Sequence, residues 1–348
     1  MTVLCLTARD GAASRPRGLQ VEGLRVPRFP RWLRELSFAS ASARAHRRSG
    51  RDLLFAVRHA LEADVYQPHG GCFRAARWAS RRSLPPSRRW MHDLGAASRP
   101  SLRVLLWLDR QVFLRSPRVV TVSVSAKVEE DFRRAYPEVA FRFERLHNAI
   151  DVERFHDRDR AERSRELRAR FSIPQRERIA LFVGHRFRLK GLLHALGVIR
   201  LAAAWHLVVV GRDEPAPFLR QARRLGVEGR VRIVGSVADP RPLYAACEAL
   251  LQPTYYDPCS LSTLESLACG TPVVTTAQNG AGELLAKGGA GLVVGDPSRE
   301  EEMAAGLREL EARWEDYHAA ASSLTPSLSW PNHISRLEEI LRRALKAR

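Results

Sequence analysis

The stretch "RIALFVGHRFRLKGLLHALGVIRLAAAWHLVVVG", residues 178–211, contains two apolar runs joined by a segment with helical spacing. The runs "RIALFVG" (178–184) and "WHLVVVG" (205–211) are apolar throughout and do not alternate with polar residues. Strands of this kind are buried on both faces, as in a parallel sheet covered by helices. Parallel neighbours need a crossover of about a dozen residues, and "GLLHALGVIRLAA" (191–203) has the pattern of a crossover helix. The stretch therefore predicts a β-α-β unit.

The same alternation continues through most of the chain. We expect strands at 2–8, 19–26, 63–71, 119–125, 141–150, 178–184, 205–211, 230–235, 249–254, 271–276 and 290–295. Repeated β-α-β units predict an α/β fold with doubly wound sheets. The strongly charged segment 151–177 indicates a domain boundary. We therefore predict a first domain over residues 1–155, completed by a C-terminal helix at 331–348, and a second over 156–325.

Size and composition exclude several classes of protein. At 348 residues and 45% apolar content, the chain is long enough for two domains with large cores. No apolar run approaches the ~20 residues of a membrane-spanning helix. The opening "MTVLCLTARD" has too short an apolar segment for a signal peptide. A reduced, cytoplasmic protein fits the cysteines better than a disulfide scaffold or a zinc site, because they are odd in number and form no CxxC pair: Cys5, Cys72, Cys247, Cys259 and Cys269.

Positive charge is concentrated in the first third of the chain. The net charge is +19, and residues 1–120 hold 23 arginines and 8 acids, a balance of +15. A basic face toward anionic lipid or an anionic acceptor is one interpretation, and nucleic-acid binding is another. A third is a plain preference for arginine, since the chain has 53 arginines and four lysines. Nucleic acid is the least favoured because no helix-turn-helix, zinc-finger or RNP pattern occurs.

Ligands of such sheets bind beyond the carboxyl ends of the strands, so the loop after 178–184 is a candidate site. It begins at Gly184, carries Arg186, Arg188 and Lys190, and ends where a helix starts. Cations next to a helix N-terminus suit an anion such as a diphosphate. A solvated basic loop is the alternative interpretation.

A second candidate site is "YYDPCSLSTLESLACG", residues 255–270, which follows the strand at 249–254. Cys259, Ser260 and Leu261 lie where a helix is expected to begin, and its first N–H groups would be free to bind a phosphate. Asp257 and Glu265 lie on either side of this helix start, where two carboxylates could hold the hydroxyls of a nucleotide-sugar. The alternative is a capping acid and an unrelated helix acid. A glycosidase pair is disfavoured because no apolar surroundings would keep one carboxyl protonated.

Three further loops follow predicted strands. The loop "AQNGAGE" (277–283) has glycines that allow a ligand to approach the backbone, and Glu283 begins the next helix. In the first domain, His69 in "QPHGG" is a candidate for contact with the acceptor or leaving group. Asn148 in "HNAID" is expected to have a structural role at the domain crossover.

Taken together, these loops resemble retaining glycosyltransferases of family 4, which have the GT-B fold of two facing Rossmann-like domains. The resemblance rests on the order and spacing of "HNAIDVERF", "FVGHRFRLKG", "VVVGRDE", "RVRIVGSV", "LYAACEALLQPTYYDPCSLSTLESLACGTPVVTT" and "NGAGELL", over roughly residues 119–300. Within the family, the chain looks closest to bacterial lipopolysaccharide core α-glucosyltransferases.

The resemblance implies roles for individual residues. Glu265 would hold the nucleotide ribose, Asp257 would contact the transferred sugar, and Lys190 would bind the donor phosphates. The accompanying arginine is ambiguous, because His185 occupies its usual place and Arg186 or Arg188 could substitute. Ser260 replaces the expected glycine, and Asp257 replaces a glutamate.

The start of the chain also departs from the family pattern. Its first two predicted strands resemble the family's second and third, so the first strand-loop-helix unit is expected to be absent. Such an absence leaves an alternative open, in which the chain is an inactive protein that binds sugar-nucleotides or nucleic acid.

The main expectation is a retaining hexosyltransferase. It would move a glucose-like sugar from a UDP-sugar to a cell-envelope saccharide or a lipid-linked acceptor such as lipopolysaccharide. Family resemblance implies that it needs no metal ion or other cofactor. We expect no nucleic-acid partner, and a cytoplasmic location that includes peripheral contact with the inner face of the plasma membrane.

Overall fold

The computed structural model describes residues 2–5, 20–27 and 29–347. The second domain contains a six-stranded sheet with the order β12-β11-β10-β7-β8-β9, and every neighbouring pair of strands is parallel. The strands are β7 (Arg178–Val183), β8 (Trp205–Val210), β9 (Val231–Gly235), β10 (Ala249–Gln252), β11 (Val273–Thr276) and β12 (Gly291–Val294). The doubly wound sheet predicted for this half of the chain is confirmed.

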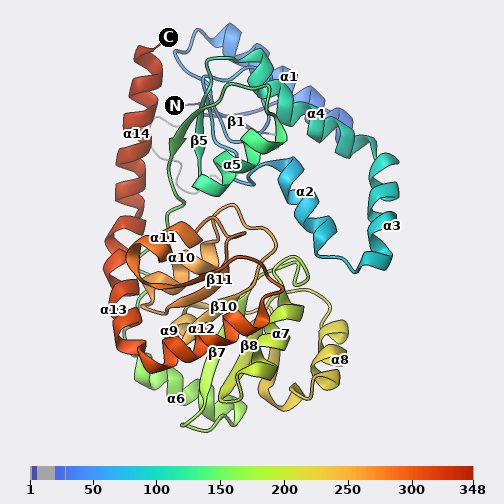
Figure 1. Cartoon of the computed structure of the whole chain (residues 1–348). Coiled ribbons are helices and arrows are strands. Elements are labelled where there is room, and N and C mark those ends of the chain that lie inside the picture. The colour runs from blue at the N-terminus through green and yellow to red at the C-terminus, as the bar shows by residue number, and fades with distance from the viewer. Residues whose placement is uncertain (1, 6–19, 28, 348) are drawn as a thin grey trace.

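Helices cover both faces of this sheet (Figure 1). They are α6 (Arg160–Phe171), α7 (Leu192–Leu201), α8 (Ala216–Arg224), α9 (Arg241–Ala246), α10 (Leu261–Ala268), α11 (Gly282–Gly288), α12 (Glu300–Ala312) and α13 (Trp314–Leu324). Every residue of β8 and β10 is buried, which explains why these runs contain almost no polar residue. The one polar side chain of β10, Gln252, lies at the carboxyl end of the strand, where the site forms.

The first domain has a four-stranded parallel sheet with the order β3-β4-β5-β6. These strands are short: β3 (Phe55–Ala56), β4 (Val65–Tyr66), β5 (Val120–Ser123) and β6 (Arg142–Arg145). Sequence reasoning missed β3, whereas the equally short β4 lies within the strand predicted at 63–71. A separate parallel pair joins β1 (Thr2–Cys5) to β2 (Gln20–Gly23). The absence of a first strand-loop-helix unit stays a prediction.

The helices of the first domain include α1 (Arg31–Ser49), α2 (Phe73–Arg82), α4 (Pro100–Arg115) and α5 (Ala126–Ala135). A further helix, α3 (Pro86–Ala97), connects α2 to α4 and lies at the side of the domain (Figure 1).

The last helix, α14 (Trp330–Lys346), runs back along the first domain (Figure 1). Its Ile340 is buried in a cluster with Val65, Val122 and Leu146 of that domain. A bridge between Ile150 and Ser329 brings the two crossing segments side by side. Among the residues that the structure describes, no helix is both long and apolar enough to cross a membrane.

Candidate active site

The loop between β7 and α7 places Lys190 at the carboxyl edge of the second sheet. Gly191 precedes α7 with a φ of 81°, and a Cβ there would lie 1.8 Å from the carbonyl oxygen of Pro253, so only glycine fits. The N–H groups of Arg186 and Phe187 donate to the two carboxylate oxygens of Asp213, at 2.9 and 2.7 Å. Asp213 therefore holds the loop in place, a role that sequence reasoning did not assign.

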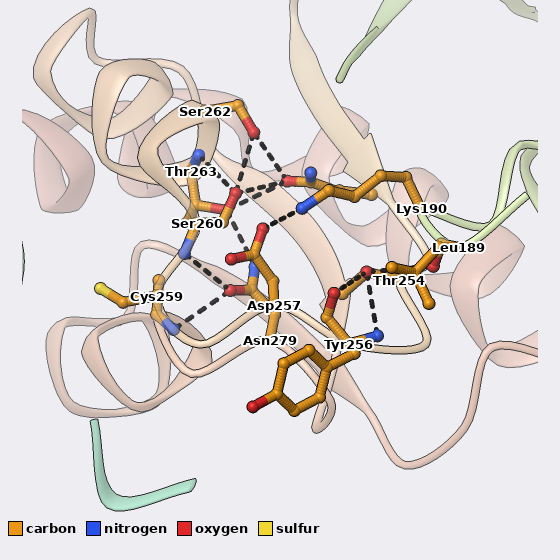
Figure 2. A network of polar contacts seen from close by, with 12 residues as sticks. Leu189, Lys190, Thr254, Tyr256, Asp257, Cys259, Ser260, Ser262, Thr263 and Asn279 are labelled. Atoms are coloured by element: carbon orange, nitrogen blue, oxygen red, sulfur yellow. Dashed lines mark hydrogen bonds and ion pairs between the residues drawn. The ribbon is translucent and has the colours of Figure 1, made fainter. Parts of the chain in front are cut away.

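Lys190 and Asp257 form an ion pair between Nζ and Oδ2 (Figure 2). Their side chains are 19% and 10% exposed, so the pair is largely shielded from water but still reachable. The backbone of Asp257 is fixed in turn, because its N–H donates to Gln278 at 2.9 Å and its carbonyl accepts from Gly280 at 2.8 Å. Lys190 from one candidate loop and Asp257 from the other thus lie together at one edge of the sheet, as expected for ligand-binding loops at the carboxyl ends of strands.

The start of α10 is organised by a network of hydrogen bonds that includes Ser260, Ser262 and Thr263 (Figure 2), whose hydroxyls all donate to Gln252 Oε1. The Ser260 hydroxyl caps the helix by accepting from the Thr263 N–H at 3.3 Å, and it donates to Gln252 Oε1 at 3.0 Å. Asn279 Oδ1 accepts from the Ser260 N–H at 3.3 Å. The expectation that all the first N–H groups are free is therefore wrong for Ser260 and Thr263.

The helix itself begins at Leu261, whose side chain is 51% exposed. The N–H groups of Leu261 and Ser262 have no acceptor among the described residues, so they remain available to an anion. Cys259 contributes only its backbone, since its side chain is buried and burial raises the pKa of the thiol to about 12.

Glu265 lies on the next turn of α10 and faces Tyr244, whose hydroxyl donates to Oε2 at 2.7 Å. Burial raises the pKa of Glu265, and the Tyr244 hydrogen bond offsets part of that rise. The Tyr244 side chain is itself fully buried, which holds the carboxylate in one orientation.

The first domain contacts this region directly. The Ser125 hydroxyl donates to the Pro258 carbonyl at 2.6 Å, and the Asn148 amide donates to the Cys259 carbonyl at 3.0 Å. Asn148 therefore has the structural role expected of it, and its partner is the candidate site. His69 lies nearby at the surface. Partial burial of the ring lowers its pKa below 6.5, and a hydrogen bond with the Asn148 side chain offsets part of that decrease. The catalytic role of His69 stays a prediction.

Glu283 makes a second link between the domains, which sequence reasoning missed. Its carboxylate accepts from the Ala126 N–H at 3.1 and 3.3 Å, bonds to His147 Nε2, and lies 3.5 Å from an Arg145 nitrogen. Burial alone would raise its pKa, but His147, the Ala126 N–H and Arg145 together hold it below the usual value. Glu283 is therefore a carboxylate that joins the domains at the start of α5, and its position in the first turn of α11 was the available signal in the sequence.

Two more contacts bring α2 against the second domain. Arg186 donates to the Ser80 hydroxyl at 3.3 Å, and Arg82 pairs with Asp296 at 2.5 Å. Arg186 thus faces the first domain, whereas Arg188 is half-buried in the same loop. The described residues contain no group of three or more His, Cys, Asp or Glu side chains placed to hold a metal ion.

Comparison with known proteins shows which proteins the chain is similar to. Residues 163–323 match the model of the family described as "Glycosyl transferases group 1". The "Lipopolysaccharide glucosyltransferase WaaG" of Escherichia coli is 29% identical over 207 residues, which are 58% of this chain and 55% of that protein. The matched region thus spans about half the length of this curated relative.

Two solved structures share the fold. The crystal structure of WaaG, "a glycosyltransferase involved in lipopolysaccharide biosynthesis", superposes with a TM-score of 0.69 at 22% identity, covering 94% of this chain and 88% of that one. Anabaena HepE "in complex with UDP and glucose" superposes with a TM-score of 0.62 at 18% identity, covering 90% and 75%. Most of the second domain thus matches the model of group 1 glycosyl transferases, the chain has the GT-B fold, and the resemblance predicted from the sequence is confirmed.

Proposed function

We propose that the chain is a retaining glycosyltransferase that moves a glucose-like hexose from a nucleotide-sugar, a UDP-sugar by preference, to a cell-envelope saccharide or lipid-linked acceptor. The observation that carries this proposal is the meeting of Lys190, Asp257 and the start of α10 at one edge of the second sheet. A cation, a carboxylate and free helix N–H groups match the phosphates and hydroxyls of such a donor.

Each group has a defined part in the reaction. Lys190 and the Leu261 and Ser262 N–H groups would bind the diphosphate, and Glu265 would accept hydrogen bonds from the ribose hydroxyls. Asp257 would exchange its pairing with Lys190 for hydrogen bonds to the sugar hydroxyls. Donor binding would therefore replace the ion pair between Lys190 and Asp257 by contacts of Lys190 with the diphosphate and of Asp257 with the sugar.

In the transfer step, the bond between the anomeric carbon and the diphosphate oxygen breaks, and the acceptor hydroxyl oxygen bonds to the same carbon on the same face. The hydroxyl proton passes to the departing phosphate, so the products are a glycoside and a nucleoside diphosphate. Lys190 and the start of α10 would stabilise the charge that develops on the leaving group. We propose that these groups suffice without a metal ion.

The choice of donor rests on analogy with the similar proteins. HepE has been solved with UDP and glucose, and WaaG is named as a lipopolysaccharide glucosyltransferase. Both descriptions support a UDP-hexose as the first donor to test. The shortened acid Asp257 is the position at which sugar preference would differ from relatives that carry glutamate.

A scan of UDP-, GDP- and ADP-sugars tests the proposal, with calorimetric binding and release of nucleoside diphosphate as the two measurements. Glu265→Gln should weaken nucleotide binding by roughly 10- to 100-fold, the effect of losing hydrogen bonds to a charged group. Asp257→Asn should lower turnover while largely sparing the affinity for the free nucleotide. Glu302→Gln is a matched control, because that acid is exposed on α12 and its partner among the described residues is Arg299.

Two results would contradict the proposal. If Glu265→Gln binds nucleotide as tightly as the wild type, the assigned role of Glu265 is wrong. If the wild type binds a nucleotide-sugar but turns none over, with or without candidate acceptors, the chain is the inactive binding protein that the sequence also allows.

A further inference from the structure

Strands β7 and β8 are parallel neighbours that pair along their whole length, and they lie side by side in the second sheet (Figure 1). The Gly184 N–H donates to the Val210 carbonyl at 3.0 Å, so the pairing continues past the end of β7. A Cβ on Gly211 would lie 2.0 Å from the Gly184 carbonyl oxygen, so glycine is what allows the two backbones to approach this closely. The next residue of each segment, His185 and Arg212, therefore leaves the sheet at the same edge.

The side chains of His185 and Arg212 meet just beyond this edge. Arg212 Nη2 lies 3.3 Å from His185 Nε2. Because a guanidinium has donors only, the imidazole accepts at Nε2, which requires the neutral ring with its proton on Nδ1. Both residues are exposed. The pair thus combines a positive charge with an imidazole N–H donor at a position that a ligand can reach.

The two acids that follow Arg212 are engaged elsewhere. Asp213 accepts from two N–H groups of the loop between β7 and α7, at 2.9 and 2.7 Å, and Glu214 accepts from the Ala216 N–H at 3.3 Å. In the part of the chain that the structure describes, no acid forms an ion pair with Arg212 or with His185. The positive charge at this edge is therefore available to an external anion.

The pair lies next to the candidate donor site. A Cβ on Gly184 would lie 3.2 Å from Lys190 Cγ, so the stem of Lys190 passes beside the start of the loop that carries His185. The following residue, Arg186, donates to the Ser80 hydroxyl of α2 at 3.3 Å, which places this loop where the two domains meet. Because β7 lies between β8 and β10, an anion at Lys190 would have the start of α10 on one side and the pair on the other.

We propose that Arg212, together with the neutral His185, binds the diphosphate of the donor beside Lys190. This inference deepens the proposed function and rests on it. The Arg212 guanidinium and the His185 Nδ1–H would donate to phosphate oxygens, and hydrogen bonds from a charged donor to a phosphate are among the strong ones. Arg212 would then share with Lys190 the stabilisation of the leaving group.

The two other arginines of the loop have different surroundings. Arg186 is bonded to Ser80 of the first domain. Arg188 is half-buried near Tyr255, since burial and Asp296 raise the pKa of that tyrosine and Arg188 is among the cations that oppose the rise. The proposed pair, by contrast, is exposed and has no acid partner among the described residues.

Calorimetric binding of UDP, inorganic pyrophosphate and uridine tests the proposal. Arg212→Ala should weaken the binding of UDP and of pyrophosphate by roughly 10- to 100-fold, the effect of losing hydrogen bonds from a charged group, and should leave uridine binding within twofold. Arg224→Ala is the matched control, because that arginine is exposed in the last turn of α8, and it should bind all three ligands as the wild type does.

A rescue variant separates a lost cation from a disturbed loop. The double variant His185→Arg, Arg212→Ala should recover most of the lost UDP affinity, because arginine at position 185 restores a cation at the same edge. Thermal melts of Arg212→Ala should match those of the wild type, since the residue is exposed.

Three results would overturn the proposal. The first is Arg212→Ala that binds UDP and pyrophosphate as tightly as Arg224→Ala, and the second is a loss of uridine binding as large as the loss of UDP binding. The third is Arg188→Ala that shows the loss instead of Arg212→Ala. Because no transfer is measured, the two proposals fail separately: Arg212-dependent UDP binding without turnover contradicts only the catalytic one, and turnover with Arg212-independent binding contradicts only this one.

Discussion

Gly71 is the residue at which a single added methyl group should separate the two domains. It has a φ of +70°, and a Cβ there would lie 2.3 Å from the Tyr256 hydroxyl and 3.0 Å from Pro258 Cγ. Both neighbours belong to the candidate site in the second domain. Tyr256 is buried and its hydroxyl bonds to the Cys72 carbonyl, so it has little room to move away.

The expected cost of Gly71→Ala has two parts. A left-handed backbone costs alanine about 1–2 kcal/mol, and forcing a methyl group into a packed contact costs about 1–3 kcal/mol more. If the domains stay together, the free energy of unfolding should fall by the sum, about 2–5 kcal/mol. If they separate, the second part is relieved and the loss appears in turnover, because Asn148, Ser125 and Glu283 leave their partners across the cleft.

Gly70→Ala is the matched control, since it has no positive φ and no atom lies within 4 Å of a Cβ at that position. Thermal unfolding and donor turnover of both variants form the assay. We expect Gly70→Ala to resemble the wild type, and Gly71→Ala to lose unfolding temperature, turnover or both. If the two variants agree in both measurements, the inferred contact between the domains at Gly71 is wrong.

Three further outcomes are expected. Glu265→Gln should raise the melting temperature of the ligand-free protein at pH values above 4.5, the ordinary glutamate pKa. Burial raises the folded-state pKa of Glu265, so the charged carboxylate lowers stability as pH rises above 4.5, and glutamine removes that charge. Equal melting temperatures of the variant and the wild type at all pH values would contradict this prediction. Ser260→Ala should lower the free energy of unfolding by about 1 kcal/mol through loss of the α10 cap, whereas Ser323→Ala, exposed and bonded only to its own helix, should have little effect. EDTA should leave nucleoside diphosphate release unchanged, and restoration of activity by a divalent cation after its removal would refute the metal-free proposal.

Much of the second domain could be predicted from the sequence, because its strands are buried on both faces. Runs such as 205–211 are uniformly apolar, and that pattern depends on local residues alone. The strand-end rule then pointed to Lys190 and Asp257, which do meet. What the pattern could not give was the hydrogen bonding at the start of α10, since Asn279 and Gln252 come from loops and strands that are neighbours only in space.

The first domain was harder to predict because fewer of its contacts are between residues that are close in the sequence. Its strands are two to four residues long, and one of the four buried residues in its cluster with α14, Ile340, comes from the far end of the chain. Contacts between the domains, such as Arg82 with Asp296, join residues 214 positions apart and leave no local pattern. Glu283 illustrates the point, because as a helix acid it looks ordinary until the structure brings His147 and Arg145 beside it.

The contacts of Glu283 and Asn148 also indicate how donor binding would be coupled to closure of the two domains. Asn148 binds the carbonyl that precedes Ser260, and Glu283 binds the start of α5, so both domains hold the loops around α10 from opposite sides. A diphosphate at Lys190 would compete for Asp257 and would act on the same loops. Donor binding and closure of the domains are therefore expected to be linked through these polar contacts.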